Sequence, residues 1–486
     1  MFPHVIPIGS SSPPKPVSNG AVVTAARCLR LALLALLACC GSALALSGSS
    51  FLKLPESQLE PLRWSELRGW DSDHHNEAFS VFLTSCRPLL KGAKPIPETS
   101  LMSEALTAVC RRASRMGKLN DRDARTFFES HFRPYRVARL GESLGLLTGY
   151  YEPIVDGSRF PTPEFKVPIY RRPDDLVSLA RHRDGDGFPN RGEVGRRIGE
   201  KIVPGYFDRA EIENGALDGR HLEICWVKDP VDALFIQIQG SARIRLEDGL
   251  LLRINYDAHN GWPFTPVGRP LIERNIIPRE EMSMARIRKW MLANPEEARE
   301  VRQTNRSFVF FRITGLGNEE EPAGGQGVRL TPGRSIAVDK ALHAYGTPLF
   351  IESDLPILDE KPTTPFQRLM IAQDTGSAII GPARADLYFG AGQDAGRIAG
   401  RIKQMGRFAV LVPRAIDPAA SAALLPLPAA RPHIAEQPVP LPRPRPKLEP
   451  DPNALAGSPA VVRPRIDGSN VRPRPQAGSW GRMAPQ

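Results

Sequence analysis

Two aspartates, Asp374 and Asp386, lie in a polar stretch with apolar flanks, residues 370–390, and could perform acid-base chemistry. On a strand, Arg384, Asp386 and Tyr388 would share one face because side chains alternate. Burial beside an aromatic ring would raise the pKa of Asp386, as a general acid near neutral pH requires, whereas Arg384 would oppose that rise. The alternative interpretation is a surface aspartate at the end of a strand.

Asp374 precedes Thr375-Gly376, which is typical of a turn whose carboxylate accepts backbone N–H groups. The string Asp374-Thr-Gly-Ser377 also resembles the active-site turn of an aspartic peptidase, which needs two carboxylates that share one proton. No second Asp-Thr-Gly or Asp-Ser-Gly occurs in the chain. A peptidase would therefore have to be a dimer.

Metal-binding patterns are weak in this sequence. The nine histidines and six cysteines show no His-x-x-x-His or Cys-x-x-Cys spacing, which argues against a zinc site. Asp184-Gly-Asp-Gly187 begins like a calcium loop, but Phe188 and Pro189 stand where a ligand and the glycine belong, so we interpret it as a turn. We expect neither a metal nor a cofactor.

The composition is that of a globular protein. With 486 residues, 41% of them hydrophobic, the chain can bury one or two large cores, which excludes a small disulfide-stapled protein, a disordered protein and a collagen. The formal charge of +11 favours anionic partners without choosing among them.

Both ends differ from the body of the chain. Arg27 and Arg30 precede an apolar run, residues 31–46, that is short for a membrane span, and Ala43-Leu-Ala45 supplies a cleavage pattern. We predict that residues 1–45 are a signal peptide with an N-terminal extension, cleaved after Ala45; a lipid anchor on Cys39 is the alternative. Residues 415–486, rich in Pro, Ala and Arg, are predicted to be a disordered tail.

Three cysteines lie outside the predicted signal. Cys86 and Cys110 fall on two helical patterns, residues 77–90 and 103–116, joined by a Pro-rich turn, and they are the candidate pair for a disulfide in an oxidising compartment. Cys225 is predicted to be a buried thiol on a strand.

The body is predicted to be mostly short strands with turns rich in Gly and Pro, which favours barrels over a doubly wound sheet. Asp248-Gly249 predicts a hairpin between two of these strands. The predicted strands are 144–153, 235–239, 242–246, 250–256, 307–311, 334–338, 347–351, 368–373, 384–389 and 408–412. The predicted helices after residue 116 are 283–293, one opened by Asn294, Pro295 and a capping box with Glu297, and 393–405.

Five motifs, in order along residues 51–414, resemble the membrane-bound lytic murein transglycosylase A family. They are Leu147-Thr-Gly-Tyr-Tyr-Glu-Pro153, Ile238-Gln-Gly-Ser-Ala242, Asn255-Tyr-Asp-Ala-His-Asn-Gly261, Asn305-Arg-Ser-Phe-Val-Phe-Phe311 and the block 373–390, which resembles the family's C-terminal three-aspartate domain. The resemblance implies a mainly β fold: a double-psi β-barrel from residues 46–154 and 313–414, an inserted smaller β-barrel domain, 155–312, and a few helices.

The resemblance also implies a reaction. Such enzymes cleave the β-1,4 bond between N-acetylmuramic acid and N-acetylglucosamine and leave a 1,6-anhydro end. The sugar's own 6-hydroxyl attacks, so one carboxyl can serve as acid and then as base, unlike the two carboxyls of ordinary glycoside hydrolysis. Asp386 would be this catalytic residue, supported by Asp374 and Thr148. The residues expected to line the glycan groove are Tyr150, Gln239, Ser241, Tyr256 and Tyr388.

The implied partner is the glycan strand of peptidoglycan. The resemblance also implies an exported, monomeric protein in the periplasm, and association with the outer membrane is left open. The export signal argues against a nucleic-acid partner. The block Gly381-Pro-Ala-Arg-Ala-Asp386 is one residue longer than in some relatives, which blurs the register there. A non-enzymatic wall-binding protein on the same barrel is the competing hypothesis, because a fold does not determine a function.

Overall fold

The structure is a computed structural model, and it describes residues 52, 54–179, 194–316, 320–359, 361 and 363–423. The predicted signal peptide, the turn at residues 184–187 and the tail beyond residue 423 lie outside the described residues. In the described ranges, no helix combines the length and the apolar character needed to cross a membrane.

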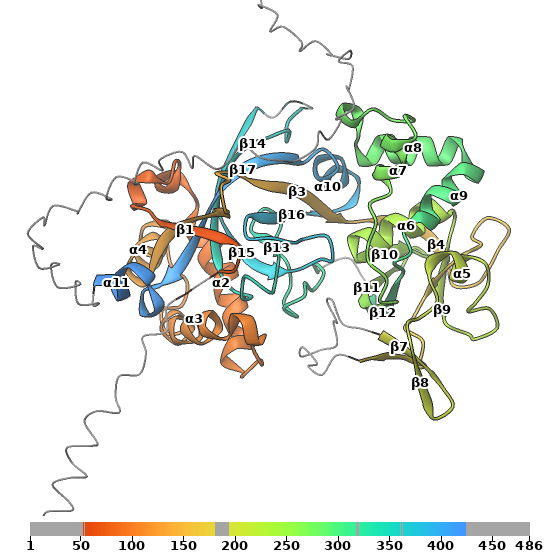
Figure 1. The fold of residues 1–486 in the computed structure, drawn as a ribbon, viewed down its shortest axis with the longest axis horizontal. Coiled ribbons are helices and arrows are strands. Elements are labelled where there is room, and N and C mark those ends of the chain that lie inside the picture. Colours follow the sequence, from red (N-terminus) through yellow and green to blue (C-terminus); the bar gives the residue numbers. More distant parts are fainter. Residues whose placement is uncertain are drawn as a thin grey trace, which may run out of the picture. The chain divides into compact units, whose positions relative to one another are not determined.

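The N-terminal part of the described chain is helical (Figure 1). Helices α2 (His75–Leu90) and α3 (Ser100–Ala113) match two predicted helical patterns, and the sulfur atoms of Cys86 and Cys110 join them at 2.04 Å. Helix α4 (Asp121–His131) was not predicted; Asn120 caps it by accepting from the N–H of Asp123. Short helices flank these elements: η1 (Trp64–Glu66), η2 (Trp70–Ser72) and η3 (Pro97–Thr99).

Six strands close into a barrel. They are β3 (Gly145–Glu152), β13 (Ser335–Val338), β14 (Pro348–Leu355), β15 (Thr364–Asp374), β16 (Arg384–Ala391) and β17 (Lys403–Pro413). Their order is β17-β14-β15-β13-β16-β3, and β3 pairs back onto β17. The pairs β13–β15 and β16–β3 are parallel, and β1 (Ser57–Pro61) and β2 (Phe132–Arg139) extend the sheet from β17. The predicted mainly β fold, with a double-psi barrel built from both halves of the chain, is confirmed.

The last predicted helix is shorter than expected. Helix α10 ends at Ala399 instead of continuing to residue 405, and it begins at Gly392. Residues 403–406 instead pair with β3, with Met405 opposite Leu146, because closing the barrel requires that edge. Beyond β17 lie η5 (Arg414–Ile416) and α11 (Pro418–Ala423).

A second sheet of six strands forms the insert. It contains β4 (Ile154–Ser158), β5 (Val167–Tyr170), β9 (Glu223–Val227), β10 (Ser241–Arg245), β11 (Leu251–His259) and β12 (Val309–Leu316), in the order β12-β11-β10-β4-β9-β5. A bridge between Arg171 and Phe311 brings the two edges together, as in a small barrel. The predicted hairpin β10–β11 is confirmed, with Gly249 at a φ of 81° in its turn. Cys225 is buried on β9, as predicted.

Smaller elements surround this second sheet. A three-stranded sheet contains β6 (Leu176–Ser178), β7 (Val194–Ile198) and β8 (Lys201–Pro204). The helices are α5 (Arg209–Glu213), α6 (Pro230–Gln239), α7 (Gly268–Glu273), η4 (Arg279–Glu281), α8 (Met284–Ala293) and α9 (Pro295–Thr304). Helices α8 and α9 were predicted, but the capping box was wrong: Asn294 makes no side-chain cap, and its Nδ2 donates to the carbonyl of Trp290.

The predicted strand 235–239 is wrong, because these residues belong to helix α6. Asp229 caps the helix by accepting from the N–H of Asp232, and Pro230 stands at its first position. Gly240 ends it in the left-handed conformation, at a φ of 80°. Almost the whole helix surface is buried, so apolar residues occur all round it and the alternation that suggests a strand has no structural meaning here.

Candidate active site

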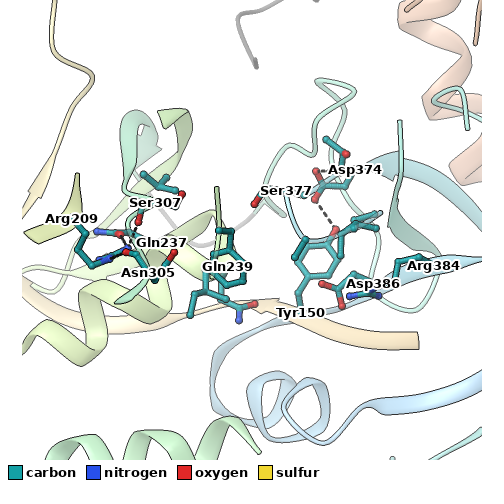
Figure 2. Close-up of a pocket in the computed structure, with 18 residues that line it drawn as sticks. Tyr150, Arg209, Gln237, Gln239, Asn305, Ser307, Asp374, Ser377, Arg384 and Asp386 are labelled. Atoms are coloured by element: carbon teal, nitrogen blue, oxygen red, sulfur yellow. Dashed lines mark hydrogen bonds between the residues drawn. The ribbon is translucent and has the colours of Figure 1, made fainter. Parts of the chain in front are cut away.

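A pocket lies where strands β3, β15 and β16 of the barrel face helix α6 and also strand β12, which belongs to the second sheet. It has a volume of about 160 Å³ and adjoins a second hollow of about 130 Å³ that shares several of its residues. Figure 2 shows two groups of polar side chains facing each other, with Gln239 between them. The barrel supplies Tyr150, Asp374, Arg384 and Asp386, and the other wall contains Arg209, Gln237, Asn305 and Ser307.

Strand pairing places Asp386 in this pocket. In β16 it stands between Ala337 of β13 and Thr148 of β3. The hydroxyl of Thr148 donates to Oδ1 of Asp386 at 2.6 Å. Burial raises the pKa of Asp386, while the Arg384 charge and the Thr148 hydrogen bond act against the rise. Asp386 is thus a pocket residue inside a barrel strand, which contradicts the alternative of a surface aspartate at a strand end.

Arg384 lies beside Asp386 and contacts its partner. Its Nη2 donates to Oγ1 of Thr148 at 2.8 Å, and its Nη1 donates to the carbonyl of Ala385 at 2.6 Å. Burial lowers the pKa of this guanidinium. The sequence indicated only that its charge would act on Asp386; the contact with Thr148 depends on the β16–β3 pairing.

Asp374, at the end of β15, is held on both oxygens. Tyr150 donates its hydroxyl to Oδ2 at 2.8 Å, and the N–H groups of Gly325 and Thr375 each donate to Oδ1 at 2.8 Å. The backbone contact with Thr375 is the one predicted for a turn. Burial raises the pKa of Asp374 to about 6, despite the three hydrogen bonds that lower it, and the nearby Asp386 charge adds to the rise. Asp374 is therefore rigidly positioned.

Most of the predicted groove residues line the two hollows. Tyr150 and Gln239 line both, and Ser241 and Tyr256 line the second. Gln239 also connects the two walls, because its Oε1 accepts from the N–H of Tyr151 at 3.0 Å. These four side chains and Asp374 line the second hollow together.

Tyr388 was predicted to line the groove, and this prediction is wrong. Its side chain is fully buried, its ring packs at 5.2 Å from that of Tyr150, and its hydroxyl donates to the carboxylate of Glu321. The face that Tyr388 shares with Asp386 is open at Asp386 but is covered further along the strand by the segment that carries Glu321.

Sequence reasoning missed the opposite wall. Arg209 donates from Nη2 to Oε1 of Gln237 at 2.7 Å, and it also donates to the carbonyls of Asn305 and Ser307. A guanidinium only donates, so the Gln237 amide has its oxygen toward Arg209 and retains its NH₂ group as a donor. Gln237 was hidden by the wrong strand prediction. Asn305 and Ser307 stood in a recognised motif without a role, and Arg209 had no signal.

The arrangement suits acid-base chemistry in a polar cavity. Two carboxyls with raised pKa lie on one wall, and amide and hydroxyl groups lie around the cavity. Among the residues that the structure describes, no group of three His, Cys, Asp or Glu side chains is arranged to hold a metal ion.

Comparisons with known proteins show which proteins the chain is similar to. Residues 146–312 match the MltA specific insert domain, and residues 334–412 match the 3D domain. A crystal structure of the membrane-bound lytic murein transglycosylase from Agrobacterium tumefaciens is 36% identical and superposes with a TM-score of 0.66, covering 74% of this chain and 98% of that one. The chain belongs to the membrane-bound lytic murein transglycosylase A family. The family resemblance seen in the sequence motifs is confirmed.

Two further relatives show how far the similarity extends. Membrane-bound lytic murein transglycosylase A of Vibrio cholerae is 34% identical over 265 residues, which are 54% of this chain and 64% of the relative. The match thus spans less than two thirds of that curated relative. A structure of Escherichia coli MltA with bound chitohexaose is 26% identical, with a TM-score of 0.51, and covers 75% of this chain and 94% of that chain.

Proposed function

We propose that the chain is a peptidoglycan lytic transglycosylase. It would cleave the β-1,4 bond between N-acetylmuramic acid and N-acetylglucosamine and leave a 1,6-anhydromuramic acid end. Family membership supports the reaction class, and the chitohexaose bound to the Escherichia coli relative supports a glycan as ligand. The observation that carries the proposal is the placement of Asp386 in the pocket, with Thr148 bonded to only one of its carboxyl oxygens.

In the proposed reaction, the protonated carboxyl of Asp386 donates its proton to the glycosidic oxygen while the bond from that oxygen to the anomeric carbon breaks. The 6-hydroxyl of the same muramic acid then forms the new bond to the anomeric carbon. The carboxylate of Asp386 accepts the 6-hydroxyl proton, which restores the acid. No water is consumed, and the attack is intramolecular, so correct positioning lowers much of the barrier.

The other pocket residues would bind and orient the glycan. Thr148 holds one oxygen of Asp386, and Tyr150 holds Asp374, whose raised pKa lets it accept or donate near neutral pH. Gln239, Ser241 and Tyr256 would contact the sugar and its acetamido groups. Domain limits of 46–154, 155–312 and 313–414, a periplasmic location and a monomeric state remain part of this proposal.

The decisive experiment is digestion of purified murein followed by mass analysis of the products. The chain should release muropeptides with anhydro ends, and Asp386→Asn should reduce the rate about 10³-fold while binding to murein persists. The matched control is Asp359→Asn, at an exposed aspartate outside the pocket, which should keep the wild-type rate.

Other outcomes would reject the proposal. Products with ordinary reducing ends would identify a hydrolase. Binding without any cleavage by the unmutated chain would favour the wall-binding alternative. Undiminished turnover by Asp386→Asn would show that this carboxyl is not the acid.

A further inference from the structure

We propose that Arg384 is a positioning residue that acts through Thr148 and determines which oxygen of Asp386 carries the transferred proton. This inference rests on the proposed function, because it assumes that Asp386 is the acid. Arg384 would not itself exchange a proton with the glycan; its role would be to direct the Thr148 hydroxyl.

The direction of the hydrogen bonds follows from the chemistry of the three groups. A guanidinium has donors and no acceptor, so the 2.8 Å contact requires Oγ1 of Thr148 to accept from Arg384. The threonine hydroxyl has a single proton, which must then point elsewhere. Oδ1 of Asp386, at 2.6 Å, is the acceptor in line for it. The relay therefore runs from Arg384 through Thr148 to Asp386.

The two carboxyl oxygens of Asp386 consequently differ. Oδ1 is occupied as the acceptor of the Thr148 proton, so the carboxyl's own proton resides on Oδ2. Oδ2 is then the atom that donates to the glycosidic oxygen. Without Arg384, the Thr148 hydroxyl could rotate and accept from Asp386 instead, which would draw the catalytic proton away from the glycan.

The backbone makes this relay rigid. Asp386 is paired with Thr148, and Arg384 with Leu146, in the parallel β16–β3 ladder, so both side chains of β16 lie beside the same stretch of β3. The second bond of the guanidinium, to the carbonyl of Ala385, fixes it to its own strand. Arg384 also lines the pocket together with Asp386, and it is partly buried.

Charged and titratable groups surround Asp386 on several strands. Arg384 is on its own strand, Tyr150 is on β3 and Asp374 is on β15; Ala337, opposite on β13, has no charge. Lys403, opposite Thr148 on β17, is exposed. Burial raises the pKa of Asp386, and the charge of Arg384 is the largest of the influences that lower it. Loss of that charge should let the pKa rise further.

The test compares the pH profiles of murein cleavage by Arg384→Met, Thr148→Val, the double variant and Arg384→Lys. Arg384→Met should lower kcat about a hundredfold with little change in KM, because the acid is misdirected after binding. The alkaline limb, where the acid loses its proton, should move to higher pH. Arg384→Lys, which keeps the charge, should leave that limb near its wild-type position and recover part of kcat.

The double variant separates the relay from a general structural effect. Once Thr148 has lost its hydroxyl, Arg384 has no hydroxyl left to orient. The fold-loss in kcat of the double variant should therefore be smaller than the product of the two single losses. Arg397→Met, at an exposed arginine of α10 paired with Asp394, is the matched control and should keep the wild-type profile. If Arg384→Met does not fold, the relay can be tested at Thr148 instead. Thr148→Ser, which keeps the hydroxyl, should keep the wild-type rate, whereas Thr148→Val, which lacks it, should lose that rate.

Each contrary result has its own meaning. An unmoved alkaline limb in Arg384→Met, losses that multiply in the double variant, or equal rates in Thr148→Ser and Thr148→Val would each overturn the relay. If any of these occurred while Asp386→Asn remained inactive, the proposed function would stand and only this inference would fail. Full activity of Asp386→Asn would instead reject the proposed function itself.

Discussion

The two aspartates of the pocket differ at the scale of single hydrogen bonds. Asp374 accepts from Tyr150, Gly325 and Thr375, and these bonds engage both of its oxygens. Thr148 holds only Oδ1 of Asp386. A carboxyl that must give up and recover a proton needs an oxygen that can reach the substrate. Under the proposed function, this hydrogen-bond pattern favours Asp386 as the acid and Asp374 as a binding or supporting residue.

Asp374 should make stability depend on pH. Burial raises its pKa from 3.8 to about 6, so between these values the folded chain holds a proton that the unfolded chain has released. The free energy of unfolding should consequently fall as the pH rises from about 4 to about 6, by about 3 kcal/mol from this group. Asp374→Asn should lose most of this fall, measured by urea unfolding at about pH 4 and about pH 7.

Asp359→Asn, at an exposed aspartate, is the control for this prediction and should show the full decrease. Asp386, whose pKa is also raised by burial, contributes in the same direction. A variant at position 374 that behaves like the wild type at both pH values would therefore show that the proton resides elsewhere in the folded state.

At the scale of elements, helix α6 controls one wall of the pocket. It presents Gln237 and Gln239 near its C-terminal end, just before the left-handed Gly240. On a strand, Gln237 and Gln239 would share one face, whereas on the helix their side chains leave in different directions, about 200° apart. Gln237 therefore reaches Arg209 while Gln239 reaches the N–H of Tyr151. The cap residues around α6 consequently determine which donors and acceptors face a ligand.

Loss of the α6 cap should weaken the fold. Asp229→Ala removes the acceptor for the N–H of Asp232 and should lower the free energy of unfolding by about 1 kcal/mol. Asp229→Ser, which can cap the same N–H, should remain close to the wild type. Chemical denaturation of the three proteins under one condition measures the difference. Equal losses for alanine and serine would indicate that the aspartate acts through its charge and not as a cap.

At the scale of the whole molecule, buried ion pairs tie the second sheet to the barrel. Arg243 of β10 donates to Glu152, at the end of β3, at 2.6 Å, and it lies 3.7 Å from Glu321. Glu321 in turn accepts from Tyr388 of β16. Glu152 and Arg243 are both buried, and burial raises the pKa of Glu152 although Arg243 opposes the rise. The two walls of the pocket are thereby held at one junction.

Breaking this junction should be costly. Arg243→Met leaves the buried Glu152 carboxylate without its main partner, and the free energy of unfolding should fall by about 3 to 5 kcal/mol. The double variant with Glu152→Gln should recover part of that loss because the carboxylate left without Arg243 is then neutral. Thermal and urea unfolding measure both effects.

Arg245→Met provides the matched control on the same strand. Its ion pair with Asp156 is exposed on both sides, so its loss should change the free energy of unfolding by less than about 1 kcal/mol. If Arg243→Met were as mild as this control, the buried pair would not hold the two sheets together.

Sequence patterns were sufficient to predict the family, the mainly β architecture, helices α2 and α3, the β10–β11 hairpin and the aspartates of the pocket. These features depend on local patterns: period-two alternation, turn residues such as Asp248-Gly249, and motifs kept in order. Local patterns failed at residues 235–239, where burial on all sides of α6 produced a misleading alternation.

Which side chains meet depends on how the strands pair in the folded chain. Thr148 and Asp386 are 238 positions apart in the chain, and their contact exists because β3 and β16 pair in one register. The same pairing brings Arg384 to Thr148, while coverage by the segment with Glu321 removes Tyr388 from the pocket. Residue type and spacing indicate what a side chain can do, but its partners, its burial and hence its pKa depend on residues that are distant in sequence and are assembled only by folding.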